Sequence, residues 1–319
     1  MNLWTPHGGQ LDRARAAYGD HGEPWIDLST GINPNPWPGV DGLAIDWRRL
    51  PDPDALAALE TTAAVYFGAD PACVLAVPGT EIGLRLLGEH LPRPVRYRWP
   101  SYGTHTEVAP HAIAVHTVVP GEGTLILANP NNPDGSIMPE ALLRGQMTQG
   151  WLVVDEAFAD AGPQRSLAGD VGEGIALIVL RSFGKFFGLA GVRLGFVLAP
   201  PTLIAALRAR LGAWPVSAAA IAIGTAAYRD AAWIEAERTR LYETAEALDA
   251  ALQARGHRPV GDCPLFRLIE TGDGCALFDR LARRSILTRP FDYDPRWLRI
   301  GLPADAASLA RLDAALGDG

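Results

Sequence analysis

Apolar and polar positions along the first two thirds of the chain form two alternating patterns. Short, almost wholly apolar runs predict buried strands, and segments with apolar residues at helical spacing predict helices between them. The predicted strands span residues 95–100, 124–130, 151–158, 176–183 and 195–200. The predicted helices span residues 53–68, 80–91, 139–149 and 201–212. Apolar strands that alternate with helices are typical of an α/β fold, in which helices cover both faces of a mostly parallel sheet.

The two ends of the chain show other patterns. A long helical stretch at about 217–256 precedes a tail in which strand-like and helical segments alternate, which predicts a small second α/β unit. The first 50 residues are rich in proline, glycine and tryptophan and show little periodicity, so we predict an irregular arm. The predicted parts are an N-terminal arm (1–35), a large domain (36–216), and a connecting helix with a small C-terminal domain (217–319).

Composition narrows the class of protein. The chain has 319 residues, of which 48% are hydrophobic, and this is enough for one large or two ordinary domains. Its net charge of −8 argues against nucleic acid as the main partner, because phosphate backbones bind basic surfaces. We expect neither a signal peptide nor a membrane anchor, since no segment has the required apolar run. Cys73, Cys263 and Cys275 lack ligand spacing and cannot all pair, which fits a reducing cytoplasm.

Polar residues gather where four of the predicted strands end. In a doubly wound sheet, ligands bind beyond the carboxyl ends of the strands. Each residue alone has a structural interpretation, since Asn-Pro-Asn-Asn-Pro is ordinary turn chemistry and Asp155 can cap a helix. Their occurrence at four strand ends predicts a single polar crevice. These residues are Ser101, Tyr102, Asn131, Asn132, Asp155, Glu156, Ser182 and Lys185.

Lys185 is the only lysine among the 28 lysine and arginine residues of the chain. Arginine stays protonated in proteins, whereas a lysine amine can lose its proton and form a Schiff base. Apolar neighbours such as Phe186 and Phe187, and a second positive charge at Arg193, both lower the pKa of an amine. A lone lysine is ordinarily a solvated surface charge. Its place in a Gly-rich turn after an apolar strand favours a chemical role here.

A Schiff-base lysine with an acidic partner and an anion cradle is typical of a pyridoxal phosphate site. Asp155, at a strand end, can keep the pyridine nitrogen of the cofactor protonated. Gly79 and Thr80 begin a predicted helix, whose first backbone N–H groups can bind the cofactor phosphate. Ser182 and Arg193 can add a hydroxyl and a guanidinium group to that phosphate site.

Three further residues complete the predicted cofactor site. Tyr102 can stack on the cofactor ring, Asn132 can donate a hydrogen bond to the ring's phenolate oxygen, and Glu81 belongs to the loop that binds the phosphate. The three histidines within 105–116 lie close together in sequence, but their spacing matches no zinc pattern. We therefore predict pyridoxal 5'-phosphate as the cofactor and no metal site.

Four stretches occur in one order along the chain: "NPNNPDG", "DEAF", "SFGKFFGLAGVRLGF" and "WLRIGL". In these the chain resembles the fold-type I pyridoxal phosphate enzymes, the class I and II aminotransferase superfamily. The resemblance implies a large domain with a mostly parallel sheet and a small C-terminal α/β domain. It also implies that Lys185 binds the cofactor covalently, that Asp155 contacts the pyridine nitrogen and that Asn132 contacts the ring oxygen. The residues that it implies for the phosphate are Gly79, Thr80, Ser182 and Arg193.

A further set of stretches points to a narrower family: "HGGQ", "WIDLSTGINPNPWP", "PGTEIGL" and "RPFDYDPRWLRIGL". These are similar to the threonine-phosphate decarboxylases of cobalamin biosynthesis, a family close to the histidinol-phosphate aminotransferases. Phe158 favours the decarboxylases, because many aminotransferases carry a tyrosine there. The chain departs from its relatives at Gly184, where a hydroxyl residue is common, and at Leu50, where relatives carry a tyrosine that reaches the neighbouring subunit's cofactor phosphate.

This narrower resemblance implies that a homodimer decarboxylates L-threonine O-3-phosphate to (R)-1-amino-2-propanol O-2-phosphate. The candidate substrate anchors are His7, Asn33, Arg289 and Arg299, and two arginines suit a substrate with two anionic ends. Other interpretations leave His7 in a disordered arm and Arg289 as a surface charge. A histidinol-phosphate-type aminotransferase and an inactive ligand-binding relative remain alternatives. The choice between threonine phosphate and serine phosphate stays open, because one methyl group discriminates weakly.

Overall fold

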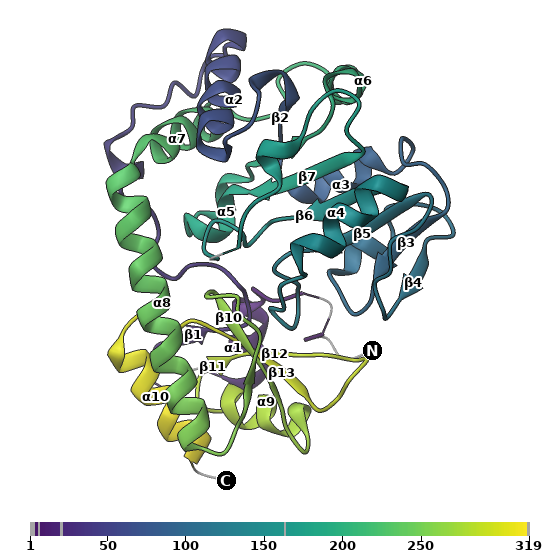
Figure 1. The fold of residues 1–319 in the computed structure, drawn as a ribbon. Coiled ribbons are helices and arrows are strands. Elements are labelled where there is room, and N and C mark those ends of the chain that lie inside the picture. Colours follow the sequence, from purple (N-terminus) through teal and green to yellow (C-terminus); the bar gives the residue numbers. More distant parts are fainter. Residues whose placement is uncertain (1–3, 6, 20–21, 163, 318–319) are drawn as a thin grey trace. The chain divides into compact units, whose positions relative to one another are not determined.

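The structure is a computed structural model that describes residues 4–5, 7–19, 22–162 and 164–317. The chain divides into two compact units, which we call the large unit and the small unit (Figure 1). The large unit comprises residues 36–132 and 137–235. The small unit comprises residues 1–35, 133–136 and 236–319, so the predicted arm belongs to it.

The large unit is built on one mixed sheet. Its seven strands, counted over the described residues, run in the order β2-β8-β7-β6-β5-β3-β4. Their bounds are β2 (Val74–Val77), β3 (Val95–Arg98), β4 (Ile113–Val115), β5 (Thr124–Ala128), β6 (Trp151–Asp155), β7 (Leu177–Ser182) and β8 (Gly195–Leu198). All neighbours pair in parallel except β8, which is antiparallel to both β2 and β7. The predicted α/β fold with a mostly parallel sheet is confirmed.

Helices surround this sheet, and the four predicted over residues 53–212 are confirmed (Figure 1). The α-helices of the large unit are α2 (Pro53–Phe67), α3 (Thr80–Leu87), α4 (Glu140–Gln149), α5 (Phe183–Phe186), α6 (Pro201–Leu211) and α7 (Ala218–Arg229). The short 3-10 helices are η1 (Pro38–Gly42), η2 (Pro71–Cys73), η3 (Gly103–Thr106), η4 (Ala168–Asp170) and η5 (Ala190–Val192). The strands β2 and β4, of four and three residues, were not predicted from the sequence.

The helical stretch predicted at 217–256 is two helices. Asp230 separates α7 from α8 (Ala231–Ala254), because its carboxylate accepts hydrogen bonds from Nε1 of Trp37 (3.0 Å) and from the backbone N–H of Trp233 (3.1 Å). The helix α7 packs on α2, where a Cβ on Gly224 would lie 3.0 Å from a methyl group of Leu59. This packing joins α7 to the large unit, so the units divide inside α8, between residues 235 and 236.

The small unit contains an antiparallel sheet in the order β12-β13-β10-β9, and a parallel pair of β1 with β11. Its strands are β1 (Ile26–Asp27), β9 (Pro259–Val260), β10 (Phe266–Glu270), β11 (Ile286–Leu287), β12 (Arg289–Pro290) and β13 (Trp297–Gly301). Its helices are α1 (Leu11–Tyr18), most of α8, α9 (Gly274–Ala282) and α10 (Ala306–Gly317). The prediction of a wholly irregular arm is wrong, because α1 forms and β1 pairs with a strand that lies about 260 residues later.

The central strands of the large unit carry its hydrophobic core. Every residue of β2, β5, β7 and β8 is buried. Strands that are buried on both faces are the least mobile part of an α/β domain, so the loops at their ends are held in place. Within the part of the chain that the structure describes, no helix is both long and apolar enough to cross a membrane.

Candidate active site

Four adjacent parallel strands bring the predicted polar residues to one edge of the large-unit sheet. Strands β3, β5, β6 and β7 are consecutive neighbours, and Asp155 at the end of β6 pairs in register with Ala128 and Leu180. The residues that follow the carboxyl ends of these strands therefore lie at the same edge. They include Ser101, Tyr102, Asn131, Asn132, Asp155, Ser182 and Lys185. Glu156 was predicted with them, but its buried carboxylate pairs with Arg181 (2.9 Å) and accepts hydrogen bonds from Ser166 and from the backbone N–H of Leu167.

Lys185 is held in a largely apolar setting after β7. It lies in α5 and is half-buried, and its neighbours Phe183, Phe186 and Phe187 are fully buried. Its Nζ atom lies 5.8 Å from the ring centroid of Phe158, which follows the end of β6. The side chain is therefore not a solvated surface charge, and its amine lies beside the turn that Asp155 begins.

The backbone next to the lysine leaves no room for a side chain at Gly184. A Cβ at position 184 would lie 2.6 Å from the Cα atom of Ala190, which begins η5. Backbone cannot yield at that distance as a flexible side chain can, so the close approach of α5 and η5 excludes a hydroxyl residue here.

Asp155 is buried and takes part in a polar chain that the sequence analysis missed. Its Oδ1 atom accepts a hydrogen bond from the backbone N–H of Ala157 (3.1 Å), and its Oδ2 atom lies 3.3 Å from Nε2 of His105. His105 is fully buried, and its Nδ1 atom lies 2.8 Å from Oγ of Ser101. A neutral His105 that carries its proton on Nε2 satisfies both contacts, because it donates to the carboxylate and accepts from the hydroxyl.

From the sequence, His105 stood out only as one of three histidines close together, whose spacing matches no zinc pattern. The structure places it with Asp155 instead, and the described residues contain no cluster of side chains suited to a metal ion. The sequence did offer one indication of this pairing. His105 comes four residues after Ser101, in the loop that follows β3 at this edge of the sheet.

The start of α3 forms a cradle for an anion. Gly79 has φ +88°, and a Cβ there would lie 2.4 Å from Nη2 of Arg193, so the guanidinium group lies against the first turn of the helix. A Cβ on Gly195 would lie 2.7 Å from the backbone N of Thr80, and Gly195 pairs in register with Ser182. The Arg193 guanidinium group and the first turn of α3 thus approach each other at positions that glycines keep open, and Ser182 lies at the neighbouring strand position, an arrangement that can bind an anion.

Tyr102 and Asn132 follow β3 and β5. The Tyr102 ring lies edge-on to the His105 ring, with centroids 5.8 Å apart, and its hydroxyl donates to Oε2 of Glu81 (2.9 Å). Burial raises the pKa of Tyr102 to about 12, so the phenol stays protonated. Asn132 is buried, and its neighbour Asn131 donates from Nδ2 to the carbonyl oxygen of Pro100 (3.1 Å), which joins the loops after the two strands.

The predicted substrate anchors belong to the small unit. Arg289 and Arg299 are register partners on β12 and β13, so two guanidinium groups are carried by neighbouring positions. Arg299 is buried, and its Nη2 atom donates to the carbonyl oxygen of Ser29 (2.8 Å). Burial, and then the charge of Arg289, lower the pKa of Arg299 to about 9. An anionic ligand would offset both effects, because it supplies the opposite charge.

The "HGG" turn packs on the same serine that Arg299 contacts. The backbone N–H of Gly9 donates to Oγ of Ser29 (2.8 Å), and a Cβ on Gly8 would lie 2.3 Å from the Ser29 carbonyl oxygen. His7 is exposed at the start of this turn, and its carbonyl oxygen accepts from the Gln10 amide (2.9 Å). His7 and Arg299 are thus tied to one short segment of the small unit.

Asn33 is the fourth predicted anchor, and its amide group is engaged within the small unit. Its Nδ2 atom donates to Oε1 of Glu237 (2.7 Å), and its Oδ1 atom accepts from Nη2 of Arg240 (2.8 Å). Asn33 and Glu237 are both buried, and Glu237 also pairs with Arg240. In the structure the Asn33 side chain therefore fastens the segment after Ser29 to α8.

The large-unit residues fit pyridoxal phosphate. The site offers the Lys185 amine, the buried Asp155 carboxylate, the aromatic ring of Tyr102 and a candidate anion site that a Cβ at position 79 would fill. These are the groups that a phosphorylated pyridine aldehyde requires.

Comparisons with known proteins agree with this fit. The sequence pattern of the family described as aminotransferase class I and II matches residues 113–316. The chain is 42% identical to a threonine-phosphate decarboxylase of Sinorhizobium sp, over 99% of this chain and 98% of that protein. It is 40% identical to a threonine-phosphate decarboxylase of Pseudomonas aeruginosa, over 97% of this chain and 96% of that protein. The fold is similar to that of histidinol-phosphate aminotransferase from Sinorhizobium meliloti in complex with pyridoxal-5'-phosphate, with a TM-score of 0.82, 21% identity, and 97% and 94% of the two chains covered.

The cradle predicts that Gly79→Ala weakens binding of pyridoxal phosphate about 10-fold, the loss of about 1.4 kcal/mol expected for one charge-assisted hydrogen bond, because the new methyl group displaces Arg193. Titration of the apoprotein with the cofactor measures the dissociation constant. Gly68→Ala is the matched control, since Gly68 has φ +68° and a Cβ there would meet nothing within 4 Å. Equal cofactor affinity in the two variants would contradict the cradle.

The polar chain predicts that His105→Asn changes the cofactor's environment. Loss of the hydrogen bond to the buried Asp155 weakens the hold on the pyridine proton by about 1.5 kcal/mol, so cofactor affinity falls about 10-fold and the visible absorbance titrates at a different pH. His111→Asn is the control, because His111 is exposed in the same loop and its φ of 63° suits asparagine. An unchanged pH titration in His105→Asn would argue against this role.

Proposed function

The chain belongs to the class I and II aminotransferase family, and from this membership we propose that it decarboxylates L-threonine O-3-phosphate to (R)-1-amino-2-propanol O-2-phosphate with pyridoxal phosphate as cofactor. The observation that carries the proposal is the pair of arginines at register positions 289 and 299, one of them buried, in a chain that matches two threonine-phosphate decarboxylases over nearly its full length. Two neighbouring guanidinium groups suit a small substrate that carries both a carboxylate and a phosphate.

The candidate site residues of the large unit would together hold the cofactor. Lys185 would supply the amine that binds it, Asp155 would accept a hydrogen bond from the pyridine N–H, and Asn132 would donate a hydrogen bond to the ring oxygen. When bound, pyridoxal phosphate withdraws electrons from the bond that breaks at the substrate α-carbon. The residues that bind its phosphate are Gly79, Thr80, Ser182 and Arg193, with Glu81 and Tyr102 beside them.

The substrate anchors select which bond breaks. The orientation of the substrate α-carbon would decide between loss of CO2 and loss of a proton, so the residues that hold the substrate would also choose the reaction. We assign this orientation to Arg289 and Arg299, which bind the two anionic groups, and assign His7 and Asn33 to the same small-unit site. The Nζ atom of Lys185 would also carry the proton that returns to the α-carbon after CO2 leaves.

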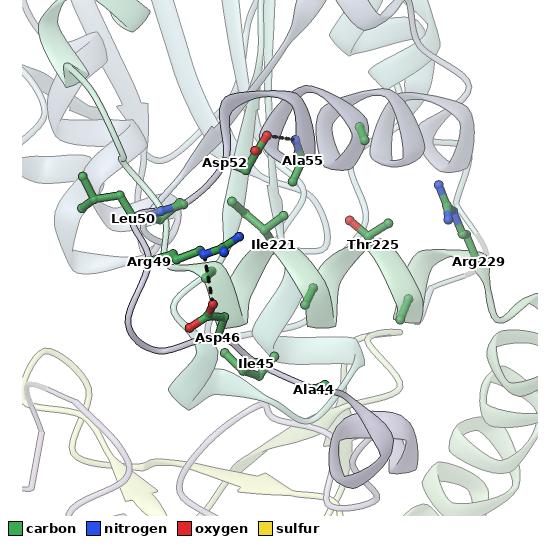
Figure 2. A pocket seen from close by; sticks show the side chains of 15 residues that line it. Ala44, Ile45, Asp46, Arg49, Leu50, Asp52, Ala55, Ile221, Thr225 and Arg229 are labelled. Carbon is green, nitrogen blue, oxygen red and sulfur yellow. Dashed lines mark hydrogen bonds and ion pairs between the residues drawn. The ribbon is translucent and has the colours of Figure 1, made fainter.

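We also propose that two copies of the chain form a homodimer. The support is a groove in the large unit, about 540 Å³ in volume, between the loop before α2 and the helix α7. Figure 2 shows Leu50, Ile221 and Thr225 along this groove. Leu50 is 66% exposed, and the nearby Trp47 is 76% exposed. Apolar side chains that are exposed beside an apolar groove are typical of a surface that a partner covers.

The reaction is assigned to the cytoplasm. The chain carries three free cysteines, of which Cys73 and Cys263 are buried. Burial raises the pKa of the Cys263 thiol to about 12, which keeps it protonated and unreactive. Free thiols without a disulfide are the normal state of proteins in a reducing compartment.

The proposed reaction predicts that the enzyme with bound cofactor releases CO2 and a phosphorylated amine from L-threonine O-3-phosphate. Arg299→Gln lowers kcat/KM about 100-fold, because it removes a charged anchor worth about 2–3 kcal/mol, and leaves cofactor affinity unchanged. Arg296→Gln is the control, since Arg296 is exposed and pairs with Asp294 and Glu270.

Parallel assays separate the remaining possibilities. Serine phosphate, which lacks one methyl group, should react no more than about 10–200-fold more slowly. Transfer of the amino group to 2-oxoglutarate, without release of CO2, would replace the proposal with an aminotransferase of the histidinol-phosphate type. If the chain bound the cofactor but catalysed neither reaction, it would be an inactive, ligand-binding relative of these enzymes.

The proposed dimer predicts that Trp47→Glu yields monomers, because a carboxylate buried against an apolar surface is strongly unfavourable. Light scattering coupled to size-exclusion chromatography measures the mass, and the unmodified chain should elute as a dimer. Val119→Glu should stay dimeric, since Val119 is 61% exposed and follows β4, at the opposite edge of the sheet from β2. A dimeric Trp47→Glu protein would exclude this surface as the interface.

A further inference from the structure

Glu81 lies at the centre of a compact group of hydrogen bonds in the large unit. Its Oε2 atom accepts from the hydroxyl of Tyr102 (2.9 Å) and from the hydroxyl of Thr104 (2.5 Å). Its Oε1 atom accepts from Nε of Arg85 (2.7 Å), one turn further along α3. The carboxylate thus joins the first turn of α3 to the loop after β3.

The surroundings keep Glu81 ionised. Burial alone would raise its pKa, but the hydrogen bonds from Thr104, Arg85 and Tyr102 lower the pKa below its usual value. Arg85 also pairs with Glu107 on the exposed side (2.8 Å), so the guanidinium group is held between two carboxylates. A charged acceptor makes stronger hydrogen bonds than a neutral one, and therefore fixes the Tyr102 ring more firmly.

Glu81 holds Tyr102, just before η3, and Thr104, inside it. His105 directly follows Thr104. Thr104 is buried, and His105 contacts Asp155 (3.3 Å), while its ring stands perpendicular to the Tyr102 ring with the centroids 5.8 Å apart. A single carboxylate therefore fixes the tyrosine ring and the turn that carries the partner of Asp155. Because the Tyr102 hydroxyl donates to Glu81, the ring offers its face rather than its hydroxyl to a ligand.

We propose that Glu81 is a positioning residue for the cofactor: it orients the Tyr102 ring, through the phenol hydroxyl, so that the ring face stacks on pyridoxal phosphate. This inference rests on the cofactor role given to Tyr102 in the proposed function. It differs from a direct cofactor contact by Glu81, because the carboxylate acts through the tyrosine and through Thr104. Glu81 and Tyr102 should then behave as one unit rather than as two independent contacts.

A double-mutant cycle tests this coupling. Glu81→Ala and Tyr102→Phe should each raise the dissociation constant of pyridoxal phosphate about 10-fold and reduce the visible circular dichroism of the bound cofactor, which reports how its ring is held. The double variant should be no worse than either single variant, because both remove the same constraint. The dissociation constant of Glu81→Gln should lie between those of the unmodified chain and Glu81→Ala, since the glutamine carbonyl oxygen still accepts a hydrogen bond.

Two controls keep the outcome decisive. Glu107→Gln should leave the affinity and the circular dichroism unchanged, because Glu107 pairs with Arg85 on the exposed side of the group. Thermal unfolding of each apoprotein separates loss of positioning from loss of fold, and the cycle is repeated with Glu81→Gln if Glu81→Ala does not fold. Additive effects of the two substitutions, or unchanged affinity and dichroism in the Glu81 variant that folds, would overturn the inference.

These measurements use no substrate, so they separate the inference from the proposed reaction. A chain that binds the cofactor with the expected coupling but releases no CO2 would keep the role of Glu81 and lose the decarboxylase assignment. A decarboxylase whose Glu81 and Tyr102 variants are additive would keep the reaction and lose the role of Glu81.

Discussion

The geometry of the large unit follows from the parallel pairing of four neighbouring strands, of which β5 and β7 are wholly buried. Because β3, β5, β6 and β7 are neighbours in register, four loops distant in sequence open at one edge of the sheet. A shift of one residue in β6 would turn Asp155 to the opposite face and separate it from His105. The buried strands thus supply the rigidity that lets short polar contacts keep their geometry.

The units divide the chemistry between them. The large unit carries the amine, the carboxylate and the anion cradle, and the small unit carries the arginine pair and the turn that packs on Ser29. Burial lowers the pKa of Arg299 and costs folding free energy, and an anionic ligand of the kind proposed for this site would offset that cost. A site that binds anions through buried cations is therefore expected to lower the stability of the fold when no anion is bound.

Residues whose chemistry is visible in isolation could be predicted from the sequence. Lys185 stood out because it is the only lysine, and Asp155 because it ends an apolar run. His105 did not, because its pairing with Asp155 depends on how the loop after β3 folds back toward β6. The same holds for Gly184, where the close approach of η5 leaves no room for a side chain. It also holds for β1, whose only strand partner among the described residues is β11. Local patterns predict elements, whereas contacts between distant segments decide which polar groups meet.

The central claim is that the Lys185 amine binds the cofactor covalently. The most direct measurement is borohydride reduction of the protein with bound pyridoxal phosphate, followed by peptide mass spectrometry. Since the chain has no other lysine, the only competing amine is the N-terminal one. The account predicts a single modified peptide that contains Lys185, and no modified peptide from Lys185→Ala. A label on the N-terminus alone, or an unlabelled Lys185 in a protein that retains the cofactor, would contradict it.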